Sequence, residues 1–143
     1  MIGHILVAID GSEHSRRAAR FAHDLAQQTR ARITLLYVLE PPRVLPIAFM
    51  ESAAFTSPHT DPKDMENVQR LLEQVAADLP KAQVEKQVEL GPPADTIVAV
   101  SQRLAVDLIV VGSRGLSLGG KWLLGSVSDR VVQHAGRPVT VVH

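Results

Sequence analysis

The chain has 143 residues, of which 45% are hydrophobic and 21% charged, and its 15 basic residues balance its 15 acidic ones. This length suffices for one domain with a hydrophobic core. The zero net charge gives no sign of a basic surface that would bind nucleic acid or an anionic membrane. The lack of cysteine excludes disulfides, thiol catalysis and thiolate metal sites. We expect one domain over residues 1–143, located in the cytoplasm, with no signal peptide and no membrane span.

The first part of the chain alternates strand and helix patterns. "HILVAID" (4–10) and "RITLLYVL" (32–39) are continuous apolar runs, typical of strands buried on both faces. Between them, apolar residues recur at helical spacing over 11–29, and Ser12 is the predicted N-cap. The proline-containing segment 40–60 has no steady period, so we expect an irregular insertion of the kind that forms lids or binding loops.

The second part continues the alternation. Asp61 and Pro62 have the pattern of an N-cap and a first helical residue, and an apolar stripe follows over 65–79. The later elements, in chain order, are an edge strand "QVEKQVEL" (83–90), a helix 94–105, a strand "DLIVVG" (107–112), a helix "SVSDRVVQHAG" (126–136) and a strand "RPVTVVH" (137–143). The expected fold class is α/β, with a five-stranded parallel sheet covered by helices on both faces.

The glycine-rich stretch "GSRGLSLGGKWLLGS" (112–126) contains two motifs that suggest catalysis, and both lack part of their context. Residues 115–121 match the phosphate-binding P-loop pattern, but Trp122 stands where a hydroxyl must bind Mg²⁺. Residues 115–119 match the G-x-S-x-G nucleophile elbow, with Asp129 and His134 later in the chain. However, Ser117 lies well beyond the strand, and a five-residue spacing on one helix does not present an Asp to a His in triad geometry.

A third pattern in the same stretch suits its position better. Gly112 and Gly115 would let the backbone approach a ligand closely, while Gly125 and Ser126 open a helix whose free N–H groups favour an anion. Ser126 and Ser128 add hydroxyl donors. The alternative is a glycine-rich connection followed by an ordinary helix cap.

The spacing G-x2-G-x9-G-[ST] resembles the nucleotide-binding motif of the universal stress protein family. Further segments resemble this family in the same order, namely "ILVAIDGS", "ITLLYVLEP", "GPPADTIVAVS", "DLIVVGSRG" and "RPVTVV". The resemblance implies a doubly wound sheet of strand order 3-2-1-4-5 and bound ATP. In that order strands one and four form the crevice where open α/β sheets bind ligands.

The resemblance also implies roles for individual residues. Adenine and ribose would be surrounded by Ala8, Ile9, Asp10 and Val38. The ribose and α-phosphate would be flanked by Val111, Gly112, Arg114 and Gly115, and the phosphates would be held by Gly125, Ser126, Val127 and Ser128. Asp10 has an alternative role as a helix cap or N-terminal helix charge. The resemblance implies, in addition, a homodimer joined through the final strand, Pro138 to His143.

The sequence favours a nucleotide-dependent switch or sensor in the stress response over an enzyme, because no general base, arginine finger or Walker-type aspartate is identifiable near the phosphates. The alternatives are a slow ATPase or phosphotransferase, and another adenosine-nucleotide-binding relative such as an electron-transfer-flavoprotein-like domain. The six histidines have no metal-ligand spacing. Any Mg²⁺ is therefore expected to arrive with ATP, coordinated by phosphates and water.

Overall fold

The computed structural model describes residues 1–41, 62–113, 116–118 and 121–143. Its five-stranded sheet has the order β3-β2-β1-β4-β7, and all neighbouring strands run parallel. The strands are β1 (His4–Ala8), β2 (Arg32–Leu39), β3 (Val84–Leu90), β4 (Leu108–Gly112) and β7 (Val139–Val142). This is the predicted order 3-2-1-4-5, with β7 as the fifth strand of the sheet.

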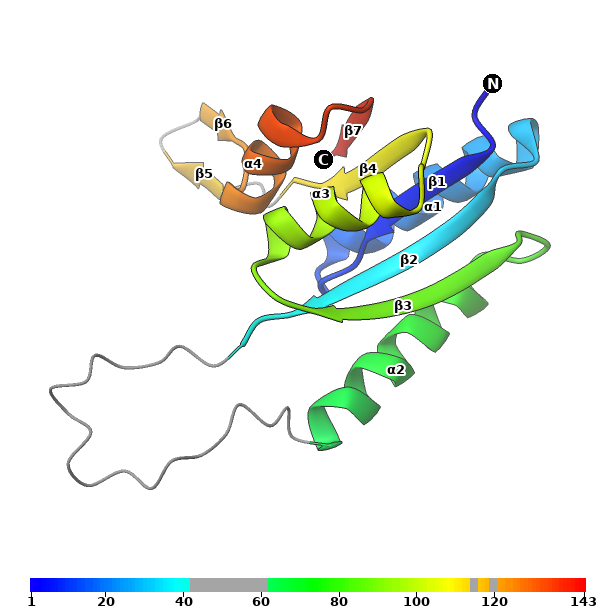
Figure 1. Cartoon of the computed structure of the whole chain (residues 1–143), viewed down its shortest axis with the longest axis horizontal. Helices are drawn as coiled ribbons and strands as arrows, with labels where there is room; N and C mark the ends of the chain where they lie inside the picture. The colour runs from blue at the N-terminus through cyan, green and yellow to red at the C-terminus, as the bar shows by residue number, and fades with distance from the viewer. Residues whose placement is uncertain (42–61, 114–115, 119–120) are drawn as a thin grey trace, which may run out of the picture.

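The described residues form four helices, which cover both faces of the sheet (Figure 1). They are α1 (Glu13–Thr29), α2 (Pro62–Ala77), α3 (Pro93–Arg103) and α4 (Ser126–His134). Ser12 is the N-cap of α1, as predicted, because its side chain accepts a hydrogen bond from the Ser15 amide. None of the described helices is both long and apolar enough to cross a membrane.

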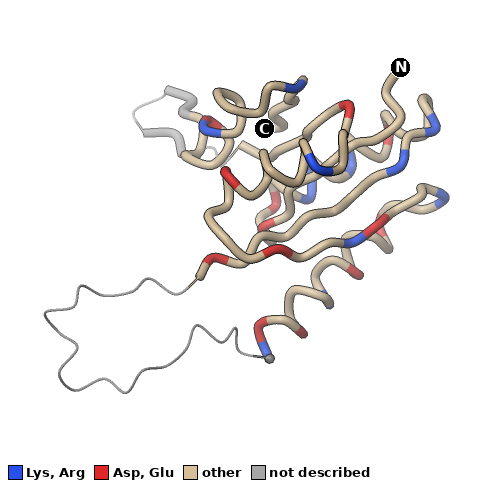
Figure 2. Tube along the Cα trace, in the orientation of Figure 1, with Lys and Arg blue, Asp and Glu red and all other residues tan. Residues whose placement is uncertain are grey.

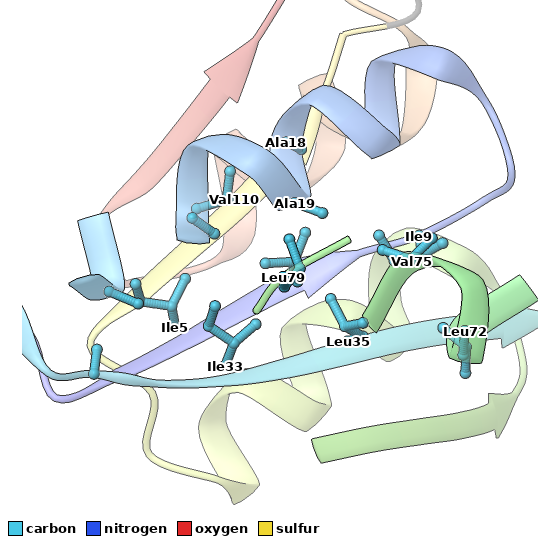
Figure 3. Close-up of a cluster of buried hydrophobic side chains, with 14 of the residues drawn as sticks. Ile5, Ile9, Ala18, Ala19, Ile33, Leu35, Leu72, Val75, Leu79 and Val110 are labelled. Carbon is cyan, nitrogen blue, oxygen red and sulfur yellow. The ribbon is translucent and has the colours of Figure 1, made fainter. Parts of the chain in front are cut away.

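Two apolar cores lie on opposite faces of the sheet. Alternate residues of each inner strand point to opposite faces, so Ile5 and Val7 pack with α1 and α2, whereas Leu6 packs with α3 and α4. Figure 3 shows the first core, in which Ala18 and Ala19 of α1 lie close over the sheet. The small side chains of α1 let this helix approach β1 and β4, and both strands are buried on both faces.

Several element boundaries, and one pair of strands, differ from the sequence-based expectations; the last helix and the last strand, for example, are shorter than expected at Ser126–His134 and Val139–Val142. The first strand ends at Ala8 rather than at residue 10, and α3 ends at Arg103, since Ala105 has a left-handed φ of 49°. The stretch expected to be only a loop contains two short strands, β5 (Leu116–Leu118) and β6 (Lys121–Leu123), which pair antiparallel. This hairpin stands apart from the main sheet, beside α4 (Figure 1). The expected insertion 40–60 and the expected N-cap Asp61 fall almost wholly outside the described residues.

Acidic and basic residues are interspersed along the helices and outer strands (Figure 2). Most ion pairs between described residues join side chains that are at least half exposed, such as Arg130 with Asp95 and Arg20 with Glu13. Exposed pairs of this kind contribute little to stability. The fold is therefore held mainly by the two apolar cores.

Candidate functional site

A cavity of about 410 Å³ opens at the carboxyl ends of β1, β2 and β4. This is the edge of the sheet at which β1 and β4 are neighbours and their connections run to opposite faces. All the predicted site residues that the structure describes line it, namely Ala8, Ile9, Asp10, Val38, Val111, Gly112, Gly125, Ser126, Val127 and Ser128. The other two predicted residues, Arg114 and Gly115, lie outside the described part of the chain.

Gly112 is needed at this edge for a reason that the sequence did not reveal. A Cβ atom on Gly112 would lie 2.5 Å from the carbonyl carbon of His14 and 2.8 Å from the amide nitrogen of Ser15. The end of β4 thus packs directly on the backbone of the first turn of α1. Helix packing alone therefore requires a glycine here, and the role of Gly112 in a ligand's approach stays a prediction.

The first turn of α4 supplies hydrogen-bond donors to the cavity. Its first intrahelical bond runs from the Asp129 amide to the Gly125 carbonyl at 2.9 Å. The amides of Ser126, Val127 and Ser128 precede this bond and so have no acceptor within the helix. Gly125, the N-cap, has φ −60° and ψ 153°, a conformation open to any residue. A side chain at Gly125 would therefore not strain the turn.

Ser128 lines the cavity as expected, but its hydroxyl has a protein partner that the sequence did not predict. It is buried, and its hydroxyl donates to the carbonyl oxygen of Gly112 at 2.7 Å. The hydroxyl proton thus fixes α4 against the end of β4 and is not directed to a ligand. Ser126 is exposed at the start of the helix, and the role of its hydroxyl as a donor to a ligand stays a prediction.

Asp10 organises the turn between β1 and α1. Its Oδ1 atom accepts hydrogen bonds from the Ser12 amide at 2.9 Å and from the Ser12 hydroxyl at 2.5 Å. Gly11 between them has φ 85°, which a glycine adopts without cost. Asp10 is therefore not the cap of α1, a role that Ser12 has; its carboxylate lies before the start of the helix and holds Ser12, and the same residue also lines the cavity.

The two catalytic motifs do not have the geometry they require. Ser117 lies in β5 and Lys121 in β6, so neither occupies the strand-to-helix turn of an elbow or a P-loop. Asp129 accepts a hydrogen bond from Gln133, and His134 Nδ1 lies 2.9 Å from the Arg130 carbonyl oxygen. Asp129 and His134 therefore contact other groups on their own helix rather than forming an acid–base pair.

Comparison with known proteins agrees with this geometry. The model of the universal stress protein family matches residues 1–143. The chain belongs to this family. It is 34% identical over 143 residues to a universal stress protein of Thermus aquaticus, with 99% of each chain covered.

Two solved structures extend the comparison. One is a universal stress protein in complex with cAMP, which is 25% identical, has a TM-score of 0.71 and covers 99% of this chain and 97% of its own. The other is the universal stress protein of Archaeoglobus fulgidus in complex with dAMP. It has a TM-score of 0.74 over 100% of this chain and 98% of its own, and at 20% identity it supports the fold alone.

This universal stress protein has further cavity residues that the sequence analysis missed. They come from the start of α1, the end of β2 and the first half of α3, namely Ser12, Ser15, Leu36, Tyr37, Leu39, Glu40, Pro93 and Ile97. The signal for the β2 residues was available, since the expected strand order places the end of β2 beside the end of β1. The α3 residues had no such signal, because their position depends on how that helix crosses the sheet.

The cavity wall is apolar on the side of α3 and more polar toward α1 and α4. Among the described residues that line it, Asp10 and Glu40 carry the charged side chains. No group of three or more histidines, aspartates or glutamates among the described residues could hold a metal ion. The described wall therefore offers amides and hydroxyls to a phosphate, together with apolar surface and two carboxylates for the rest of a ligand.

Proposed function

We propose that this universal stress protein binds adenine nucleotides in the 410 Å³ cavity, with ATP as its ligand. The observation that carries the proposal is that the ends of β1 and β4 and the start of α4 line one common hollow. Its size is in the usual range for small-molecule sites, and its free amides favour an anion at one end. The cAMP-bound relative adds support, since its ligand also joins adenine, ribose and phosphate.

The adenine and ribose would occupy the end of the cavity formed by β1 and β2. Ala8, Ile9 and Val38 offer apolar contact there, and the Asp10 carboxylate would accept hydrogen bonds from ribose hydroxyls. Ile97 of α3 supplies further apolar wall on the side of Val38. Burial of the base against these side chains would supply most of the apolar contribution to binding.

The phosphates would lie toward β4 and α4. Val111 and Gly112 would flank the ribose and α-phosphate, together with Arg114 and Gly115, which are assigned by the family motif. Gly125, Ser126, Val127 and Ser128 would surround the phosphates, mainly through backbone amides. Mg²⁺ would accompany ATP, neutralise phosphate charge and be coordinated by phosphates and water.

We propose further that the protein acts as a nucleotide-dependent switch or sensor rather than as a fast enzyme. The two acidic residues of the described wall are Asp10 and Glu40, and the Asp10 carboxylate already holds the turn before α1. Turnover of ATP is expected well below the enzymatic median of about 10 per second. Hydrolysis at or above that rate would favour the ATPase alternative.

Backbone amide resonances provide the test of location. Addition of ATP, AMP or cAMP to the ¹⁵N-labelled protein is expected to shift the amides of Gly112, Gly125 and Ser126. The amides of Gly3 and Asp107, at the opposite edge of the sheet, are expected to stay unchanged. Shifts confined to the amino edge, or no shifts with any of the three nucleotides, would contradict the proposal.

We also propose a homodimer joined through Pro138 to His143. β7 is an edge strand of the sheet, and all four of its residues are half-buried rather than exposed. An edge strand of Val139, Thr140, Val141 and Val142 is an aggregation hazard unless another strand covers it. Two-fold pairing with the same strand of a second copy would cover both edges.

A further inference from the structure

A second hollow of about 360 Å³ adjoins the cavity. The two share Glu40, Pro93, Ser126 and Val127 in their linings, so a ligand in the first could extend into the second along a common wall. The rest of the second hollow is formed by the first turn of α3 and by Arg130 of α4. It therefore adjoins the start of α4, where the proposed function places the phosphates of a nucleotide.

Arg130 alone carries positive charge among the described residues that line the two hollows. It lies four residues after Ser126 in α4, so the two side chains share one face of the helix. Long side chains of a helix lean toward its N-terminus, which here is the end facing the cavity. Arg130 can thus reach the region beyond Ser126 without any movement of the backbone.

An ion pair with Asp95 at present holds the guanidinium group. Arg130 Nε lies 2.9 Å from Asp95 Oδ1, and the two side chains are 58% and 56% exposed. Exposed pairs of this kind are weak, and Asp95 lies in the first turn of α3, where the helix dipole stabilises a carboxylate without a cation. Replacing the ion pair between Arg130 and Asp95 by one between Arg130 and a phosphate group would therefore cost little free energy.

We propose that the second hollow is the subsite for the terminal phosphates of a nucleoside polyphosphate, and that Arg130 leaves Asp95 to bind them. This inference rests on the proposed nucleotide function. The planar guanidinium group can donate two parallel hydrogen bonds to phosphate oxygens. AMP has no phosphate beyond the first cavity, so Arg130 distinguishes a nucleoside triphosphate from a monophosphate.

Dissociation constants of ATP and AMP, measured by isothermal titration for four variants, test the proposal. Arg130→Gln is expected to weaken ATP binding roughly threefold to tenfold and to leave AMP binding unchanged. Asp95→Asn frees Arg130 and is expected to strengthen ATP binding. Arg103→Gln and Glu89→Gln are the matched controls, because they disrupt an ion pair of 2.6 Å between α3 and β3 and change the net charge equally.

Three results would overturn the inference. They are ATP binding that Arg130→Gln leaves unchanged, an equal loss of ATP and AMP binding in that variant, and an equal loss of ATP binding in Arg103→Gln. Each of these leaves the proposed nucleotide site intact. A wild-type protein that binds neither ATP nor AMP would instead overturn the proposed function, and this subsite with it.

Discussion

The Ser128 hydroxyl donates a 2.7 Å hydrogen bond to the carbonyl oxygen of Gly112. This bond joins the first turn of α4 to the carboxyl end of β4, and it lies in the wall of the larger cavity. The position of the free amides of α4 relative to the sheet therefore depends on a buried serine.

Ser128→Ala is expected to lower the free energy of unfolding by about 1 kcal/mol, because a buried hydrogen bond is lost. ATP binding should weaken as well, since the first turn of α4 is no longer fixed to β4. Urea denaturation and isothermal titration would measure the two effects. Ser126→Ala, in the same turn but exposed, is the control and should leave the stability nearly unchanged. Equal stability of the two variants would contradict the bracing role of Ser128.

Gly112→Ala tests the contact between β4 and α1. The added methyl group would lie 2.5 Å from the His14 carbonyl carbon and 2.7 Å from its oxygen, so the helix would have to move. We expect a loss of about 3 kcal/mol in the free energy of unfolding, measured by urea denaturation. Gly3→Ala is the control, because the nearest atom to its Cβ would be Asp107 Oδ2 at 3.6 Å. If Gly112→Ala unfolded at the same urea concentration as the wild type, the packing of β4 on α1 would not be tight.

His4 lies buried at the amino edge of the sheet, where its hydrogen bonds determine which ring nitrogen carries the proton in the neutral form. Arg32 donates to Nδ1 at 3.1 Å, so Nε2 carries the proton and donates to the Thr34 hydroxyl at 2.8 Å. Burial, and then the charge of Arg32, hold the pKa of His4 below its ordinary value of 6.5, against the weaker influence of Glu85, the Leu104 backbone and Asp107. Protonation would place a cation beside Arg32 without full solvation.

The stability of the protein is therefore expected to fall as the pH falls below 6.5. In that range the unfolded chain binds a proton at His4 and the folded protein does not, so protons favour unfolding. Urea midpoints between about pH 7.5 and about pH 5.5 would measure the slope, and His4→Gln should reduce it. The pKa of Asp107, held below 3.8 by the Gly3 and His4 amides, keeps that carboxylate out of this range. If the stability of His4→Gln depended on pH as steeply as that of the wild type, His4 would not be the group responsible.

Proline substitutions in β7 test the proposed dimer. The Ile109 amide donates to the carbonyl oxygen of Pro138, and the Ser113 amide donates to that of Val142. These two bonds show which residues of β7 direct their backbone groups toward β4. In this pattern the Thr140 amide points inward to β4 and the Val141 amide points outward. Thr140→Pro should therefore damage the fold, whereas Val141→Pro should yield a folded monomer. Analytical ultracentrifugation would decide, and a wild-type monomer at tens of micromolar would contradict the dimer.

The sequence was sufficient to predict most of the fold, because its signals are local. Continuous apolar runs marked β1, β2 and β4, and the alternation of polar and apolar residues marked β3 as an edge strand. The β5–β6 hairpin was missed, since its two strands have three residues each and glycine-rich flanks, too short for a periodic pattern. The strand order came from the family resemblance rather than from periodicity.

The sequence predicted the part of the candidate site in which glycine and serine residues follow a strand. It did not predict the cavity residues and contacts that depend on how the helices and strands pack. The contact of Gly112 with His14 and the bond of Ser128 to Gly112 join residues far apart in the chain. Tyr37 and Ile97 line the cavity only because β2 and α3 lie beside β1 in space. Such contacts depend on the tertiary arrangement, and a local pattern carries no information about them.

The most direct test of the central claim is isothermal titration of ATP into the wild-type protein and into Gly125→Val. The Gly125 backbone accepts any residue, so a valine there would add a branched side chain to the cavity wall without straining the turn. Gly3→Val, at the opposite edge of the sheet, is the matched control. We expect ATP binding by the wild type and by Gly3→Val, and its loss in a Gly125→Val protein whose urea midpoint is unchanged. Equal ATP affinity in all three proteins, or no binding by the wild type, would contradict a nucleotide site at the start of α4.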